Sequence, residues 1–131
     1  MRRSVPHGPK MRGFTLIELL VVLAIVSMLL TLAVPRFFSS VDTAKETILV
    51  ENLRLTRETL DKFYSDQGRY PDNLDELVES QYLKYLPNDP VVNSRNAWVV
   101  VPPKEGIKGK VFDIRSSAPG KNRFGQPFDQ L

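Results

Sequence analysis

The stretch FTLIELLVVLAIVSMLLTLAV, residues 14–34, contains a single charged side chain, Glu18. A helix of about 20 apolar residues crosses the hydrocarbon core of a bilayer, so the stretch predicts a membrane-spanning helix. A carboxylate at the centre of such a helix costs roughly 2.5–3.5 kcal/mol, and less near the membrane interface. Glu18 therefore needs a partner or a function.

The residues before this stretch are basic. Residues 1–13 carry four of the 18 basic side chains and no acid, and their removal leaves 14 basic and 15 acidic side chains. The net charge of +3 thus belongs to the leader. It indicates an inside-facing topology signal rather than a phosphate-binding surface, and we expect no nucleic-acid partner.

The composition excludes several kinds of catalytic site. The chain has no cysteine, and its one histidine, His7, lies in the leader. Disulfides, thiol nucleophiles and cysteine zinc sites are therefore excluded. A membrane-anchored periplasmic enzyme would have to use carboxylates such as Asp72, Asp75 and Glu76. Acids are expected in the first turn of a helix, so we disfavour this alternative.

Three interpretations of the apolar stretch compete. A secretory signal cleaved after Ala33 has acceptable small residues at the cut, but the stretch is long for an h-region and contains an acid. A plain signal anchor would tolerate Glu18 near the membrane edge. The third interpretation takes Gly13, Phe14 and Glu18 together as one motif, and it is the one that we favour.

Gly13-Phe-Thr-Leu-Ile-Glu18 resembles the class III signal of the type IV pilin and pseudopilin family. The resemblance implies that a prepilin peptidase cleaves between Gly13 and Phe14 on the cytoplasmic side and methylates the new amine of Phe14. It also implies that Glu18 of one subunit meets the Phe14 amine of a neighbour during filament assembly. Within one helix the two groups lie one turn apart, so a simple local cap is the alternative.

Apolar residues at spacings near three and four continue from Phe38 to Phe63. They predict an amphipathic helix over 35–66 whose apolar stripe packs against a C-terminal head, with Gly68 at its end. Pro35 predicts a kink, or a locally melted segment at 33–36, because proline removes one helical hydrogen bond. The resemblance adds that subunits in filaments often lose helicity just ahead of such a proline.

The remaining residues predict a small head. Asn73 and Glu76 have the capping-box spacing of a short helix, and two β-rich runs at 97–102 and 110–114 predict an antiparallel sheet on the long helix. The sheet is expected to bury Trp98, Val100, Val111 or Phe112. The fold class is therefore α+β, and the chain divides into a cleaved leader (1–13), a transmembrane and assembly helix (14–34), an amphipathic helix (35–66) and a periplasmic head (67–131).

Gly68-Arg-Tyr-Pro71 and Tyr82-Leu-Lys-Tyr-Leu-Pro-Asn-Asp-Pro90 are similar to the major, G-type pseudopilin of type II secretion. This similarity implies a single-pass inner-membrane protein that forms a helical homo-oligomeric filament in the periplasm and drives secretion. Its partners would be the prepilin peptidase, minor pseudopilins and the inner-membrane assembly platform. The alternative within this fold is a type IV pilus subunit for motility, adhesion or DNA uptake. Adhesive pilins commonly close their C-terminal region with a disulfide, which this chain cannot form.

Calcium is the one candidate cofactor, because G-type pseudopilins bind it in an acidic, glycine-rich C-terminal loop. Calcium takes about six to eight oxygen ligands. Here the candidate ligands are Asp113, Asn122 and Asp129, and the positive charges of Lys121 and Arg123 oppose a cation. We therefore favour a packed, metal-free loop.

Overall fold

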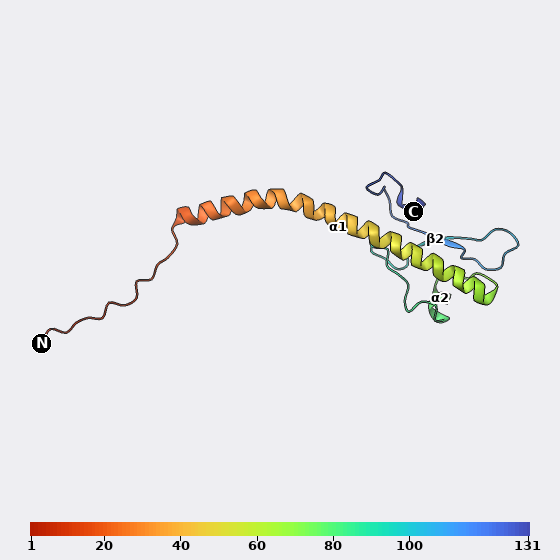
Figure 1. The fold of residues 1–131 in the computed structure, drawn as a ribbon, viewed down its shortest axis with the longest axis horizontal. Coiled ribbons are helices and arrows are strands. Elements are labelled where there is room, and N and C mark those ends of the chain that lie inside the picture. The colour runs from red at the N-terminus through yellow and green to blue at the C-terminus, as the bar shows by residue number, and fades with distance from the viewer. The chain divides into compact units, whose positions relative to one another are not determined.

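The computed structural model describes residues 1–131 and contains two compact units, Met1–Phe38 and Ser39–Leu131. In chain order the elements are α1 (Leu16–Gln67), α2 (Asp75–Glu79), β1 (Val99–Val101), β2 (Asp113–Arg115) and the 3-10 helix η1 (Phe128–Gln130) (Figure 1). This combination confirms the predicted α+β class.

The first unit has no core of its own. Residues 1–15 have no regular structure, and every side chain from residue 1 to residue 40 is exposed. Its helical part is long and apolar enough to span a membrane, with a mean hydropathy of 2.7 over 18 residues. A helix that is apolar on all sides is stable only where lipid or other protein covers it.

α1 continues through Pro35 without a break. Pro35 has no N–H to donate, but the turns on both sides keep their own hydrogen bonds. The locally melted segment expected at 33–36 is therefore not present in this chain by itself. The kink at Pro35 stays a prediction.

The core of the second unit forms around one face of α1. Leu49, Leu53, Thr56, Leu60 and Phe63 are buried at alternating spacings of four and three residues, as the amphipathic pattern predicts. Other elements and loops add Leu77, Trp98, Val111, Ile114, Ala118 and Phe128.

Three members of the predicted stripe lie outside this core: Phe38, Val41 and Ile48. Phe38 and Ile48 remain 61% and 49% exposed, and Val41 is only partly buried. The packed face thus begins at Leu49, later along the helix than the sequence pattern suggests.

The end of α1 and the start of α2 follow the predicted capping rules. Gly68 takes a φ of +68° and donates its N–H to the Tyr64 carbonyl at 2.8 Å. At α2, the Asn73 side-chain oxygen accepts the Glu76 N–H at 2.9 Å. The Glu76 carboxylate reaches back to the Asp72 N–H at 2.7 Å. The capping box is therefore formed, with its return bond one residue earlier than in the usual arrangement.

β1 and β2 pair antiparallel, with Val100 opposite Ile114. Trp98 is buried and donates its indole N–H to the Pro87 carbonyl at 3.0 Å, and Val111 is also buried. The prediction was wrong for the other two candidates, because Val100 is 41% exposed and Phe112 is 46% exposed.

The strands are only three residues long, and Ile114 takes the core position of the pair. Phe112 packs edge-on against the Tyr70 ring at the rim, with 5.3 Å between ring centroids. The short strands therefore leave apolar side chains of both β-rich runs at the surface, Val99 and Val100 in the first and Phe112 in the second.

Candidate functional site: the start of α1

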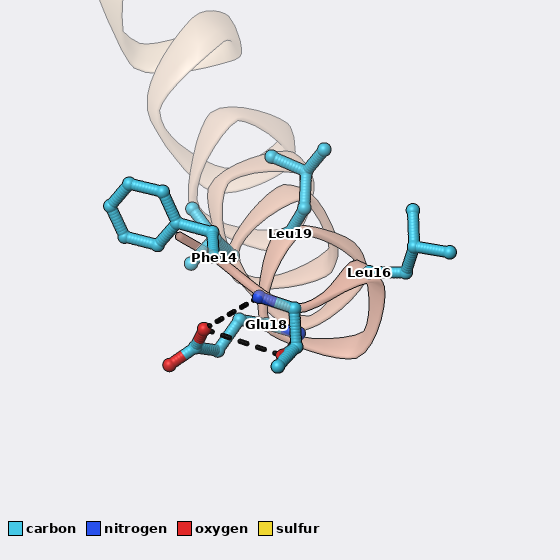
Figure 2. A pocket seen from close by; sticks show the side chains of 6 residues that line it. Phe14, Leu16, Glu18 and Leu19 are labelled. Carbon is cyan, nitrogen blue, oxygen red and sulfur yellow. Dashed lines mark hydrogen bonds between the residues drawn. The ribbon is translucent and has the colours of Figure 1, made fainter. Parts of the chain in front are cut away.

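A capping box opens α1. The Glu18 N–H donates to the Thr15 hydroxyl at 3.2 Å. One oxygen of the Glu18 carboxylate accepts the Thr15 N–H at 3.0 Å and lies 3.3 Å from the Thr15 hydroxyl (Figure 2). Each residue satisfies a polar group of the other, as a Ser/Thr-x-x-Glu spacing allows.

In the uncleaved chain, the hydrogen-bond donors to the Glu18 carboxylate come from Thr15. The pairing of Glu18 with a Phe14 amine requires the cleaved chain and stays a prediction. Sequence reasoning missed Thr15, although the Thr15-Leu-Ile-Glu18 spacing is the same signature that identifies the cap of α2. Thr15 gives the carboxylate neutral donors, so the negative charge has no cation.

The two residues of the predicted cleavage site, Gly13 and Phe14, lie next to this cap in an accessible segment. Gly13 and Phe14 precede α1, have no regular secondary structure and are exposed, Phe14 to 94%. A Cβ added at Gly13 would meet no atom within 4 Å. In Figure 2 the labelled side chains of Phe14, Leu16 and Leu19 project outward from the helix around the capped end. They belong to an open apolar hollow lined by Phe14, Thr15, Leu16, Glu18, Leu19 and Val22.

The three calcium candidates do not fit a calcium site. The Asp113 carboxylate lies 2.7 Å from the Arg57 Nε, which neutralises it. The Asn122 side-chain oxygen accepts two backbone N–H groups, at 2.9 and 3.0 Å. Asp129 is exposed on η1. The donor set thus lacks the several free carboxylate oxygens that calcium prefers.

The carboxylates considered for an enzyme have ordinary structural surroundings. The Arg69 guanidinium binds Glu76 at 2.5 Å, and this hydrogen bond holds the pKa of Glu76 below its usual range. Asp72 and Asp75 are exposed. The Glu76 carboxylate is engaged by Arg69 and by the Asp72 N–H, so the arrangement stabilises the start of α2 and does not resemble acid–base machinery.

Comparison with known proteins places the site in a family. Residues 8–34 match the model of the prokaryotic N-terminal methylation motif. The chain is 31% identical over 126 residues to type II secretion system core protein G of Escherichia coli strain K12, covering 84% of this chain and 83% of that protein. The chain belongs to the type II secretion core protein G family. Core protein G of Pseudomonas aeruginosa strain PAO1 is 35% identical over 126 residues, with 83% of this chain and 84% of that protein covered.

A relative from another system shares less of the chain. Competence protein ComGC of Halalkalibacterium halodurans is 31% identical over 91 residues, which is 68% of this chain and 89% of that protein. No solved structure shows significant similarity to the chain. Core protein G relatives are structural pseudopilins, so the chain is a structural protein anchored in the inner membrane through its apolar helix, and not an enzyme.

Proposed function

We propose that this chain is the repeating subunit of a type II secretion pseudopilus, a helical filament of identical copies that extends into the periplasm and drives export. The single observation that carries this proposal is the pair of core protein G relatives, each aligned over more than four fifths of its length. The apolar surface of α1 supports the proposal, because the side chains of residues 16–34 are all exposed in the single chain. Lipid would cover them in the membrane, and neighbouring subunits would cover them in the filament.

Processing is the first step of the proposed cycle. A prepilin peptidase would remove residues 1–13 on the cytoplasmic side and methylate the Phe14 amine. The extended, exposed segment around Gly13 suits a protease, which binds its substrate in an open backbone conformation. The remaining chain would span the inner membrane once, with residues 67–131 in the periplasm.

Assembly follows from the charge of Glu18. In the uncleaved chain its carboxylate accepts hydrogen bonds from the neutral donors of Thr15. A neighbouring Phe14 ammonium would give it a charge-assisted hydrogen bond, which is roughly twice as strong as a neutral one.

In the proposed filament Pro35 would mark a flexible point of α1. The minor pseudopilins and the inner-membrane assembly platform would bind the subunits as they leave the membrane.

Mass spectrometry of the protein purified from membranes tests the processing step. We expect a mature chain that begins at methylated Phe14. Gly13→Ala should slow or abolish cleavage, whereas the control Gly8→Ala should be processed normally. The two variants are matched because an added Cβ meets no atom within 4 Å at either position, so neither disturbs the structure of the chain. A mature chain that starts at Val34, or that retains Met1, would contradict the proposal.

A type IV pilus subunit remains the second candidate, and the match to ComGC is the observation that favours it. The two candidates differ in their machinery. Co-purification with a secretion secretin and its ATPase would support the pseudopilus, and co-purification with pilus components would support the alternative.

A further inference from the structure

The segment Gly120–Phe128, which we call the tail loop, is closed by its own polar groups. The Asn122 side-chain oxygen accepts the N–H groups of Phe124 and Gln126. The Asn122 N–H donates to the Gln126 carbonyl at 2.8 Å, and the Gly125 N–H donates to the Asn122 carbonyl at 3.0 Å. One asparagine therefore organises the turn, through both its side chain and its backbone.

A carboxylate of α1 attaches this loop to the helix. Glu46 accepts the backbone N–H of Arg123 at 2.9 Å, and its second oxygen lies 3.6 Å from the Arg123 Nε. The Glu46 side chain is 15% exposed, so most of its surface is covered. A carboxylate removed from water to this degree needs a cation or hydrogen-bond donors, and Arg123 supplies one nearby cation and one backbone donor.

The charges of the loop do not suit a divalent metal. Lys121 and Arg123 give it two positive charges, and no acid lies between Gly120 and Phe128. Asp113 is paired with Arg57. No cluster of three or more acidic, histidine or cysteine side chains in residues 1–131 is arranged to hold a metal ion. A calcium ion here would meet like charge and donors that are already engaged.

We infer that the tail loop is held on α1 without a divalent metal, by the Arg123 guanidinium on Glu46 and the Asn122 turn. A side-chain cation, rather than a bound metal ion, then compensates the charge of Glu46. The inference concerns the fold of the second unit and does not depend on the filament proposal. It predicts that the head keeps its stability when calcium is removed.

Thermal unfolding and limited trypsin digestion of the full chain in detergent micelles test this inference. Trypsin cuts after Lys121 and reports whether the loop is attached. For the wild-type chain, we expect the same midpoint and the same digestion rate in excess EGTA and in millimolar calcium. Glu46→Gln should lower the midpoint by about 4–8 °C and speed cleavage several-fold in both solutions. The matched control Glu51→Gln changes an acid of the same helix that binds Arg54, and it should leave cleavage unchanged.

Calcium dependence would overturn the inference. A site that binds calcium would raise the midpoint with calcium concentration by mass action. An effect of Glu46→Gln no larger than that of Glu51→Gln would also overturn it. If Glu46→Gln does not fold, Arg123→Gln serves instead, because it removes the guanidinium and keeps the backbone N–H that binds Glu46. Unchanged cleavage of that variant at Lys121 would contradict the role of the cation.

Discussion

Replacement of Thr15 by valine tests the cap of α1 with little change in side-chain shape. The hydroxyl that accepts the Glu18 N–H at 3.2 Å is lost, while the Thr15 N–H that donates to the carboxylate at 3.0 Å remains. Loss of a side-chain N-cap costs typically about 1 kcal/mol. That free energy corresponds to about a fivefold change in the local opening equilibrium. We therefore expect the Glu18 amide of Thr15→Val to exchange about fivefold faster.

Hydrogen exchange measured by NMR on the full chain in micelles gives the effect residue by residue. Thr31→Val is a matched control, because it removes a hydroxyl that donates to the Ser27 carbonyl inside the helix and lies far from the cap. That variant should leave the Glu18 amide unchanged. Leader cleavage should persist in Thr15→Val, since Gly13 and Phe14 lie outside the helix. Equal exchange in wild type and Thr15→Val would refute the capping assignment.

Two further predictions concern the second unit. Leu53→Ala should lower the free energy of unfolding by about 2–5 kcal/mol, whereas Leu55→Ala, at a 45% exposed site on the same helix, should change it by less than about 0.5 kcal/mol in denaturant titrations. The hydrogen bond from Arg69 lowers the pKa of Glu76 in the folded chain. The stability that this bond gives the fold is therefore fully present above the pKa of Glu76 in the unfolded chain, and it is lost as the pH falls through the lower pKa of the folded chain. Unfolding midpoints measured from about pH 5 to about pH 3 should therefore fall less steeply for Glu76→Gln than for wild type. An equal slope would contradict this contribution.

The helices could be predicted from the sequence because their signals are local. Apolar spacing and Gly68 gave an end near Asp66, and α1 ends at Gln67. The cap of α2 followed from Asn73 and Glu76 in the same way. The cap of α1 had an equally local signal in Thr15. The charge of Glu18 points to a cationic partner, whereas the donors in the uncleaved chain are the neutral groups of Thr15.

The head could be predicted only in outline because its decisive contacts join distant residues. Arg123 reaches Glu46 across 77 positions and Arg57 reaches Asp113 across 56, and no local pattern specifies either pair. The alternation of a three-residue strand also does not say which face is buried. The sequence therefore does not reveal that Ile114 is buried while its partner Val100 is exposed.

The cap also explains why an acid at this position is informative. A neutral glutamine at position 18 would offer a side-chain oxygen to the Thr15 N–H and would cap the helix nearly as well. The negative charge is therefore not needed for the cap, and in lipid it adds a cost. A cation would offset that cost, and the proposed cleavage before Phe14 would create an ammonium group in the same turn of each subunit.

Glu18→Gln separates these two functions. We expect normal leader cleavage and near wild-type exchange at the amide of residue 18, together with a strong loss of filaments in a shearing or cross-linking assay. Glu18→Ala should lose the filaments and the exchange protection of the Thr15 amide, because the carboxylate that accepts the Thr15 N–H is removed, whereas the N–H of residue 18 keeps the Thr15 hydroxyl as its acceptor. Filaments of normal length and number from Glu18→Gln would show that a hydrogen-bond acceptor is sufficient. The proposed pairing with the Phe14 amine would then be wrong, while the capping box of α1 would stand.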